Sequence, residues 1–527
     1  MLIASLLGVV GIIALGEPMD TVDEIRKEAT MRRDTAVGNP LPLASHWITG
    51  SHKFSKGWGL KTQLKLIDEG QYILPWSARL KTPEEREAVT ELAKRKLPFT
   101  LVNTEWEYLL SKPPYINLSE KKNPNVITVD GKARKMVSPF GPVSPWREVG
   151  KHWTTLKSVT ELEKIYPDPP LVVFLSNNEH SKLRWNAVEI SKRYLRKYGT
   201  GRSYNLKNKV IIDGWAERYR ALQSGMRQGL TNENWRKHAI FIAYGGGVSY
   251  LGRWGGWRNY AQYLPGMADP MALTWDGASE SFYTLDTIPI TDFRMWSPQI
   301  EFMNDVFIQK EYYRINPNFW FELSVWDGHQ KGLKTDKKKF YENLGQKCPP
   351  ERYAGMVQFG MWLLRPRVVR EWRSWTMNWD EYKALFMEVV KSCDRVHRNP
   401  VLRKWWRKGT LVANKAHKHP YQTDIPDEIK EVGRWFLLDA DVNPQEYPWE
   451  SFWTVNVYAL ALTMGEAPSR KWLVYAHSPL QNRKSVELTV PGYGKVKVDV
   501  TVGGSFYELD EKTRKTKFVT SSKEGEK

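Results

Sequence analysis

Cysteine is scarce in this sequence: its 527 residues include only Cys348 and Cys393. Two cysteines exclude a disulfide framework and a cysteine-rich metal site. If the chain is exported the two can pair, and their spacing does not decide the matter. The sequence also lacks a Gly-rich phosphate-binding loop after its first predicted strand, because the GGG at 245–247 does not have that spacing. This absence argues against a dinucleotide-binding fold.

No nucleic-acid-binding motif is present either, although the chain is basic. Lys and Arg number 78 against 59 Asp and Glu, which gives a net charge of +19. Such a charge favours anionic partners. The basic residues are spread along the chain without a dense basic arm, so we predict no nucleic-acid partner. The charge is compatible with an anionic glycan, and a neutral glycan is equally compatible.

The sequence has no apolar run long enough to cross a membrane. The longest, MLIASLLGVVGIIALG at 1–16, holds about 14 apolar residues, whereas a helical span needs about 20. With small residues at Ala14 and Gly16, this run is typical of a secretory signal segment. It predicts a secreted protein, periplasmic or extracellular, with no membrane span. A buried N-terminal strand or helix is the alternative.

Aromatic residues, in contrast, are abundant: the chain has 25 Trp, 24 Tyr and 18 Phe. A buried tryptophan needs a partner for its N–H, so this surplus indicates recognition as well as packing. Flat aromatic faces suit sugar rings and other planar ligands. The 41% hydrophobic content is otherwise that of a soluble globular protein with a large core.

Apolar runs alternate with amphipathic helical patterns over the first 400 residues. Helices are predicted at 83–96, 160–166, 189–198 and 297–313. Roughly eight apolar runs separated by such helices favour a (β/α)₈ TIM barrel, an α/β fold, over residues 40–415. The eight predicted strands are 46–50, 71–79, 98–106, 171–179, 239–246, 271–277, 319–328 and, with the weakest pattern, 355–364.

The remaining segments have different compositions and sequence patterns. Residues 107–147 are rich in Pro, Gly and Asn and predict a long loop after the third strand. Residues 380–413 predict a helix. Alternating β segments separated by turns then predict an antiparallel β-sandwich over 430–515, followed by a polar tail at 516–527.

Two glutamates stand at the ends of predicted strands. The fourth strand, LVVFLSNNE, ends in Asn178 and Glu179, and the seventh, FWFELSVWDG, carries Glu322. Catalytic groups of barrel enzymes lie at the carboxyl ends of the strands. Because the fourth and seventh strands lie across the barrel from each other, the two carboxyl groups are predicted to face one another. The alternative is that both glutamates cap helices.

In this arrangement the sequence resembles clan A of the glycoside hydrolases, the (β/α)₈ superfamily that hydrolyses β-linked sugars, although no single family is assigned. The resemblance implies that Glu179 is the acid/base, that Asn178 contacts the sugar 2-hydroxyl and that Glu322 is the nucleophile. It covers the barrel and extends to the C-terminal β module. It implies a glycoside hydrolase that acts on a β-linked polysaccharide or oligosaccharide by a retaining mechanism.

Further residues are assigned around this pair. Arg79, at the end of the second strand, is the candidate cation that keeps Glu322 ionised, and Tyr244, at the end of the fifth, is a candidate hydrogen-bond donor. Barrel packing is the alternative role for the tryptophans. The candidate stacking faces for sugar rings are Trp254, Trp257, Trp275 and Trp326.

Other carboxylates and histidines compete with this assignment. Asp213, Asp276, Glu280 and Asp327 are interpreted as structural or substrate-contacting residues. His417 and His419 lack a nearby carboxylate cluster, and His46 and His52 do not have the His-x-His spacing of metal-dependent barrel hydrolases. The sequence therefore predicts neither a metal nor a cofactor. The alternative function is a non-catalytic barrel protein that binds carbohydrate or a surface.

Overall fold

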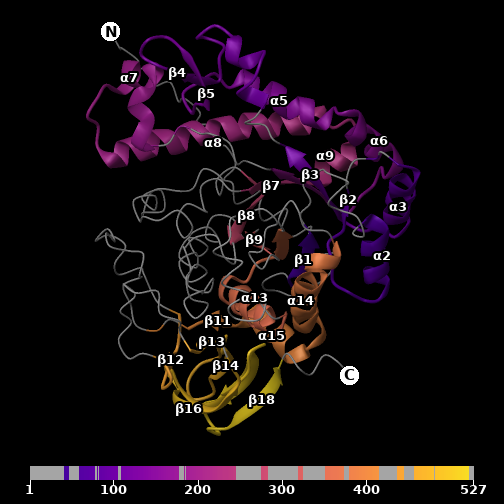
Figure 1. The fold of residues 1–527 in the computed structure, drawn as a ribbon, viewed down its shortest axis with the longest axis vertical. Coiled ribbons are helices and arrows are strands. Elements are labelled where there is room, and N and C mark those ends of the chain that lie inside the picture. The colour runs from indigo at the N-terminus through magenta and orange to yellow at the C-terminus, as the bar shows by residue number, and fades with distance from the viewer. Residues whose placement is uncertain are drawn as a thin grey trace, which may run out of the picture.

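The computed structural model describes most of the chain outside its first 40 residues. The described residues are 41–46, 59–77, 80, 82–104, 109–176, 183, 185–244, 275–282, 319–324, 350–372, 379–412, 414, 436–443, 456–479 and 481–521. The predicted signal segment at 1–16 and the predicted helix at 297–313 lie outside them, as does the predicted first strand at 46–50 except for His46. Figure 1 shows a central sheet between a set of long helices and a C-terminal group of strands.

The central sheet has eight parallel strands in the order β1-β10-β9-β8-β7-β6-β3-β2. Its strands are β1 (Leu43–His46), β2 (Trp76–Ser77), β3 (Phe99–Thr104), β6 (Val172–Ser176), β7 (Ala239–Tyr244), β8 (Gly277–Phe282), β9 (Phe319–Ser324) and β10 (Val368–Trp372). Strand β6 is buried throughout, as expected of a parallel sheet covered on both faces. The predicted α/β class with a parallel sheet is confirmed.

Helices follow most of these strands along the chain. The predicted helix at 83–96 is present as α3. Thr82 is its N-cap and forms a capping box with Glu85. The helices that flank the sheet are α2 (Leu60–Asp68), α3 (Pro83–Lys94), α6 (Lys157–Ile165), α9 (Glu233–His238), α13 (Pro350–Leu364), α14 (Trp379–Arg398) and α15 (Pro400–Lys408).

The predictions for the sixth and eighth strands were wrong in position. Residues 355–364 belong to helix α13, and the eighth strand is β10 at 368–372. Every residue of α13 from Arg352 to Leu364 is buried, so its sequence has no polar face to reveal a helical period. The sixth strand begins at Gly277, where the predicted run at 271–277 ends.

The segment that precedes β2 contacts β1, the strand at the other end of the strand order. Ala44 in β1 forms a parallel bridge with Ile73, three residues before β2. The Ala44 N–H donates to the Tyr72 carbonyl at 3.0 Å, and the Leu74 N–H donates to the Ala44 carbonyl at 2.9 Å. We call this contact the seam.

The C-terminal part of α14 packs against the seam. The Asp394 carboxylate accepts a hydrogen bond from the Tyr72 N–H at 2.9 Å. The His397 ring stacks on the Tyr72 ring with centroids 3.7 Å apart, and its Nε2 lies 2.7 Å from the Pro42 carbonyl. Arg398 donates to the Gly70 carbonyl at 2.8 Å. One helix therefore contacts the chain on both sides of the seam.

A helical lobe extends from the carboxyl ends of β3 and β6. It consists of residues 109–156 and 185–229, which form η1 (Tyr115–Asn117), β4 (Asn125–Ile127), β5 (Ala133–Val137), α5 (Ser144–Thr154), η2 (Trp185–Ile190), α7 (Lys192–Tyr198) and α8 (Tyr204–Gly229). The prediction of a loop at 107–147 was therefore incomplete, because β4 and β5 pair as an antiparallel hairpin inside it. The predicted helix at 189–198 begins at Lys192, after η2.

Helices α5 and α8 approach each other closely through glycines, and Figure 1 shows them side by side. A Cβ atom on Gly150 would lie 2.0 Å from the Leu222 carbonyl oxygen, and one on Gly225 would lie 2.0 Å from the Arg147 carbonyl oxygen. Each helix thus accommodates the backbone of the other at a glycine. Any larger side chain at either position would force the helices apart.

The C-terminal strands form two antiparallel sheets. One has the order β11-β13-β14-β17-β18 and the other β12-β15-β16. Their strands are β11 (Thr410–Leu411), β12 (Asp439–Ala440), β13 (Tyr458–Met464), β14 (Lys471–His477), β15 (Arg483–Val490), β16 (Gly494–Val500), β17 (Ser505–Asp510) and β18 (Thr516–Ser521). Apolar residues from both sheets share one hydrophobic cluster. The predicted tail at 516–527 was wrong for residues 516–521, which form β18; residues 522–527 lie outside the described ones.

The five-stranded sheet also packs on the helices of the central sheet. Its other face contributes Tyr458, Leu460 and Tyr475 to the main hydrophobic core. The Tyr475 hydroxyl donates to the Gly355 carbonyl of α13 at 2.7 Å. The predicted helix at 380–413 is two helices, because Asn399 caps α15 at Pro400, and β11 then joins the C-terminal sheet inside the predicted barrel range of 40–415.

We expect Asp394→Asn to change how stability depends on pH. Burial raises the pKa of Asp394 from its ordinary value near 3.8 to about 6. As pH rises from about 4 to 6, the unfolded chain therefore loses this proton first and the folded protein loses stability. The difference corresponds to about 3 kcal/mol, fully lost above about pH 6. Asparagine keeps an acceptor for the Tyr72 N–H without this cost.

Thermal unfolding between pH 4 and 8 tests this. Asp394→Asn should melt above the wild type at pH 8 and at the same temperature near pH 4. The exposed Asp213, which pairs with Lys209 at 2.7 Å, provides the control: Asp213→Asn should follow the wild type at each pH. An Asp394→Asn protein that is less stable than the wild type at pH 8 would contradict the expectation.

Gly225→Ala should separate α5 from α8. We expect a loss of roughly 1–3 kcal/mol in the free energy of unfolding, larger than the gain in helix propensity. Urea unfolding measures it. Gly59→Ala is the matched control, because no atom lies within 4 Å of the added Cβ. Equal stability of the two variants would show that the helices accommodate the methyl group.

Candidate active site

A row of laterally paired residues crosses four strands of the central sheet. Ser45 of β1 pairs with Arg370 of β10, Arg370 pairs with Glu322 of β9, and Glu322 pairs with Ser281 of β8. Neighbouring strands lie about 4.8 Å apart. The backbone therefore sets Glu322 directly beside a cationic residue, with a serine position on its other side.

The alternation of the strands separates this row from the face that the helices cover. Phe174 of β6 pairs laterally with Phe241 of β7, and Phe174 contacts Trp235 of α9 with ring centroids 6.5 Å apart. Side chains at the alternate strand positions that include Phe174 and Phe241 therefore face the helices; we call these positions the helix-facing parity. Following the registers from Phe241 into β8 and β9 assigns Glu280 to the same parity and Glu322 to the opposite one.

Arg370 is the residue that the sequence reasoning missed. Its side chain is fully buried. A buried guanidinium is costly without a compensating anion, and the adjacent register position holds Glu322. Because the eighth strand was predicted at 355–364, the sequence VVREW at 368–372 was not predicted as a strand. Its signal is an arginine in a short β-branched run shortly after a long apolar helix.

Tyr244, predicted as a hydrogen-bond donor, is the last residue of β7. It pairs laterally with Ser279, which pairs with Trp320. Trp320 lies two residues before Glu322 on β9, so the Tyr244 position has the same parity as the Glu322 position. The hydrogen bond to the nucleophile remains a prediction.

Trp275 does not provide a stacking face. It precedes β8 and so lies at the amino end of that strand, away from the carboxyl ends where the site was predicted. Its side chain is 2% exposed, and its ring lies 5.8 Å from that of Tyr219 in α8, edge to face. The prediction was wrong because β8 begins at Gly277, two residues after Trp275, and not before it. Trp275 is a core residue.

Asp276 connects the amino end of β8 to β7 and α8. Its carboxylate accepts from the Phe241 N–H at 2.8 Å and pairs with Arg227 at 3.2 Å. Burial raises the pKa of Asp276, while Arg227 and the Phe241 N–H act in the opposite direction. The contacts are those of a structural carboxylate. Asp213 lies on the exposed surface of α8, where it pairs with Lys209.

Several predicted residues lie outside the described part of the chain. Among the candidate site residues they are Asn178, Glu179, Arg79, Trp326, Trp254 and Trp257. Among the competing residues they are Asp327, His417 and His419. Strand β6 ends at Ser176, three residues before Glu179 in the sequence. Because β6 is the fourth parallel strand along the chain and β9 the seventh, the strand numbering behind the predicted pair agrees with the sheet.

The described residues contain neither a metal-binding cluster nor a membrane-spanning helix. Among them, no three or more His, Cys, Asp or Glu side chains gather where they could hold a metal ion. Within the same residues, no helix is long and apolar enough to cross a membrane. Cys393 is a free thiol buried in α14, and its pKa is raised by burial.

Comparisons with protein-family models and with curated proteins find no match. Solved structures do match, at low similarity. A family 36 α-galactosidase of Geobacillus stearothermophilus in complex with raffinose is 11% identical with a TM-score of 0.37; the match covers 94% of this chain and 58% of that one. The chain therefore spans less than two thirds of that enzyme's length.

Two further matches are shorter enzymes. A broad-specificity endoglucanase of family 5, subfamily 4, from an uncultured bacterium is 8% identical with a TM-score of 0.35, over 70% of this chain and 99% of that one. A chitinase of Chromobacterium violaceum is 9% identical with a TM-score of 0.31, over 67% and 98%. All three are glycoside hydrolases.

Proposed function

We propose that the eight parallel strands form a closed (β/α)₈ barrel and that the two C-terminal sheets form a β-sandwich. The parallel bridge between Ala44 and Ile73 supports closure, because it joins β1 to the segment that enters β2 at the other end of the strand order. The hydrophobic cluster shared by the two antiparallel sheets supports the sandwich.

On this scaffold we infer a glycoside hydrolase that cleaves a β-linked polysaccharide or oligosaccharide with retention, using Glu179 and Glu322. The observation that carries the proposal is the register of Glu322: it lies on the seventh parallel strand beside the buried Arg370, on the parity opposite to the helix-facing one. A carboxylate next to a fixed cation stays ionised, as a nucleophile must. Glu179 follows the fourth strand, across a closed barrel from the seventh.

The two carboxyl groups then have different tasks. Glu322 attacks the anomeric carbon and forms a glycosyl–enzyme bond, while Glu179 gives its proton to the leaving oxygen. Glu179 next takes a proton from water, which hydrolyses the intermediate. This chemistry requires carboxyl groups about 5–5.5 Å apart. Asn178 would bind the sugar 2-hydroxyl, and Trp254, Trp257 and Trp326 would stack on sugar rings.

Arg370 takes the role first considered for Arg79. Both follow from the same requirement for a cation beside Glu322, but Arg370 is its direct neighbour in the sheet. A carboxylate at the Glu322 position would offset the cost of burying the guanidinium, and the cation would favour the ionised form of that carboxylate. We therefore propose Arg370 as a positioning residue for the nucleophile.

Substitution of the two glutamates tests the mechanism. Glu322→Ala should abolish covalent labelling by a fluoro-sugar that traps the glycosyl–enzyme. Glu179→Ala should lower kcat roughly 10²–10⁴-fold on natural glycans and spare aryl glycosides whose leaving group needs no proton. A panel of polysaccharides and aryl β-glycosides, followed by mass spectrometry of the labelled protein, measures both effects.

Glu280→Gln is the matched control, because Glu280 lies on the adjacent strand with the opposite parity. It should label like the wild type. Labelling that survives in Glu322→Ala would refute the nucleophile. Tight binding of a glycan by the wild type, without any hydrolysis, would favour the non-catalytic carbohydrate-binding alternative.

Arg370→Gln should move the acidic limb of the pH–rate profile. Loss of an adjacent cation raises a carboxyl pKa by about 1–3 units, so kcat/KM should begin to fall at a correspondingly higher pH. Arg370→Lys keeps the charge and should move the limb less. Circular dichroism identifies any variant that fails to fold. An unchanged acidic limb in folded Arg370→Gln would overturn the positioning role.

A further inference from the structure

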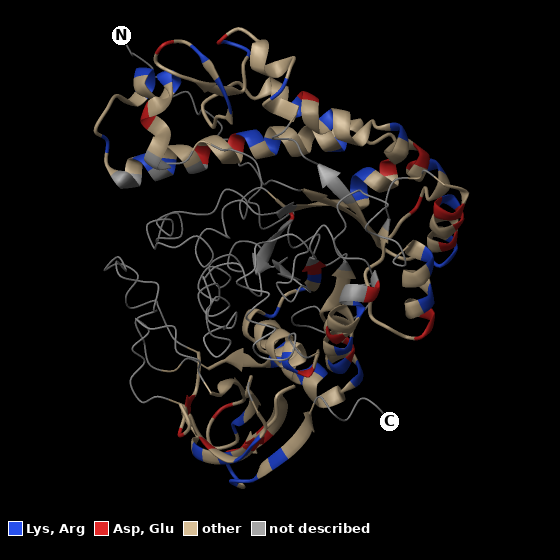
Figure 2. Cartoon of the chain, viewed as in Figure 1, with Lys and Arg blue, Asp and Glu red and all other residues tan. Residues whose placement is uncertain are grey.

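The helical lobe contains a cavity of about 480 Å³ with mostly basic walls. Its residues come from three segments of the lobe: the loop before β4, the loop before α5, and helix α7. Four of them are cationic and one is acidic. The lining residues are Glu120, Lys121, Phe140, Gly141, Pro142, Arg193, Arg196 and Lys197. Figure 2 shows the basic residues of α7 and α8 in blue.

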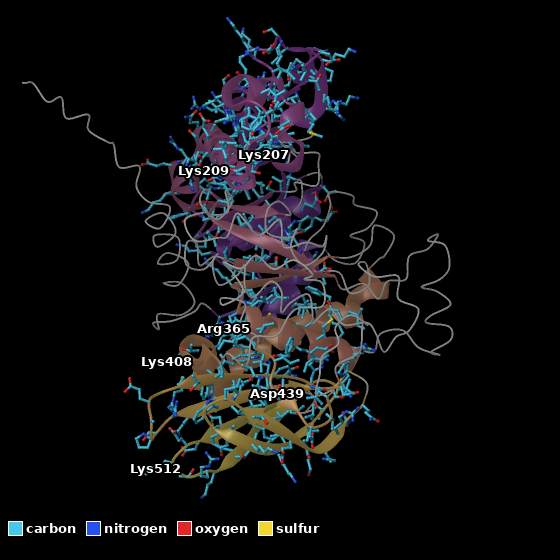
Figure 3. All side chains as sticks on the ribbon, turned by 90° about the vertical axis from the view of Figure 1, so that its left-hand side faces the viewer. Lys207, Lys209, Arg365, Lys408, Asp439 and Lys512 are labelled. Atoms are coloured by element: carbon cyan, nitrogen blue, oxygen red, sulfur yellow. The ribbon has the colours of Figure 1, made fainter. Side chains whose placement is uncertain are left out.

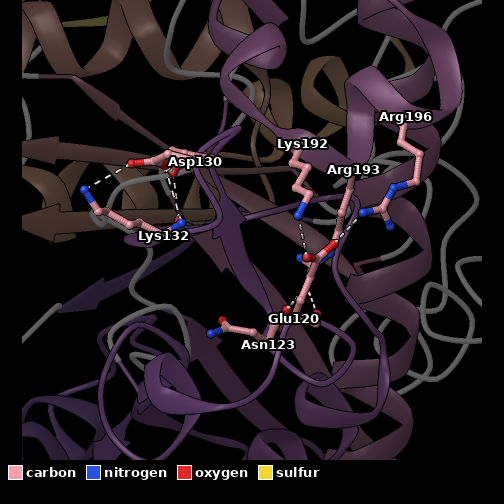
Figure 4. Close-up of polar contacts among 8 residues, drawn as sticks. Glu120, Asn123, Asp130, Lys132, Lys192, Arg193 and Arg196 are labelled. Atoms are coloured by element: carbon pink, nitrogen blue, oxygen red, sulfur yellow. Dashed lines mark hydrogen bonds and ion pairs between the residues drawn. The ribbon is translucent and has the colours of Figure 1, made fainter.

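The single acid in the cavity is already matched by cations. The Glu120 carboxylate pairs with Lys192 at 3.1 Å and with Arg196 at 3.0 Å, as Figure 4 shows. These two contacts lower the pKa of Glu120, the hydrogen bond from Lys192 most. Glu120 therefore stays ionised and does not neutralise Lys121 or Lys197. The cavity keeps an excess of positive charge.

Arg193 stiffens the wall of the cavity. Its guanidinium donates to the carbonyls of Asn125 at 2.9 Å, Asn123 at 2.8 Å and Glu120. Burial lowers the pKa of Arg193; Glu120 opposes this effect, while the neighbouring Arg218 and Arg196 add to it. The charge of Arg193 is thus held by carbonyl dipoles in a positive surrounding, which an incoming anion would stabilise.

Part of the cavity wall is apolar. Phe140 packs on Tyr194 and Tyr198, with ring centroids 5.5 and 6.2 Å away. Arg218 of α8 is almost fully buried and donates to the Gly141 carbonyl and to the Gly214 carbonyl. The cavity thus combines a half-buried aromatic ring with exposed ammonium and guanidinium groups.

We propose that this cavity binds a sugar unit that carries an anionic group, a carboxylate or a sulfate. The cations would hold the anion and Phe140 would contact the apolar face of the ring. In the sequence, the cavity residues follow the carboxyl ends of β3 and β6, the ends at which the proposed active site lies. The inference therefore rests on the proposed function and makes an acidic glycan its substrate class.

A nucleic acid fits these observations less well. Its phosphates require a groove that follows the backbone over many nucleotides, with bases stacked on several aromatic rings. Here the cations surround one cavity with a single aromatic wall, Phe140. The volume suits one or two sugar units.

Equilibrium binding at fixed ionic strength tests the inference independently of catalysis. The probes are an oligogalacturonate, a sulfated heparin oligosaccharide, cellohexaose and oligo-dT. We expect one or both anionic glycans to bind. Lys121→Ala/Lys197→Ala should weaken that binding about 10-fold or more and reduce its salt dependence. Whether the carboxylated or the sulfated probe binds identifies the anion.

The control variant is Lys209→Ala/Lys237→Ala, which removes the same charge from residues that do not line the cavity. Figure 3 places Lys209 on the helical lobe. It should bind like the wild type. Phe140→Leu should weaken the binding of the anionic oligosaccharide. The affinity for inorganic sulfate, measured by competition, should stay unchanged. Equal losses in the two lysine pairs, or oligo-dT binding that exceeds that of both glycans, would overturn the inference.

The same probes separate this inference from the proposed function. Hydrolysis of a neutral glycan without binding of either anionic one would overturn the cavity assignment and leave the glycoside hydrolase. Cavity-dependent binding of an anionic glycan by a protein that hydrolyses no glycan would refute the enzyme and leave the binding site.

Discussion

The contact between Ala44 and Ile73 constrains the rest of the central sheet. Neither β1 nor the segment before β2 is long, and the backbone bonds between them are few. Helix α14 adds side-chain contacts to these few backbone bonds: Asp394 accepts from the Tyr72 N–H, and His397 stacks on the Tyr72 ring. A parallel pair at a sheet end is weak without such cover. The seam is therefore held by side chains of a helix more than 300 residues away in sequence.

The seam also bears on the proposed chemistry, because β1 is the neighbour of β10. Ser45 pairs with Arg370, and Arg370 pairs with Glu322, so the register that runs from β1 through β10 to β9 sets the cation beside the acid. A slip of one residue in β10 would exchange Arg370 for Glu371 in that row and set two acids side by side. Packing of α13 and α14 on β9 and β10 thus has an electrostatic consequence.

Strands with an uninterrupted apolar run could be predicted from sequence. LVVFL and AIFIAY correspond to β6 and β7, and the capped helix after Thr82 was also found. The eighth strand could not be found in this way. GMVQFGMWLL is buried on all sides as part of α13, since it lies between the central sheet and the C-terminal sheet, so it resembles a buried strand. The true strand carries two charges in five residues.

The site residues differ in the same way: some follow from a local sequence pattern, and others depend on contacts between distant segments. Glu322 was predicted because it comes toward the end of a predicted strand, whereas the role of Arg370 depends on a register between two strands that no local pattern specifies. The basic cavity was missed for a related reason. Its walls come from segments near residues 120, 140 and 195. Arg193 joins two of them through the carbonyls of Glu120, Asn123 and Asn125, and Phe140 packs on Tyr194 and Tyr198.

The helical lobe links the central sheet with the basic cavity. The lobe is formed by the chain that follows β3 and β6, and Glu179 also follows β6 in the sequence. The close glycine packing of α5 on α8 gives this extension a rigid base, because two backbones in contact leave little freedom for sliding. A binding wall built on such a base holds its charges at fixed positions, which favours a ligand with a matching, localised anion over one recognised by diffuse charge alone.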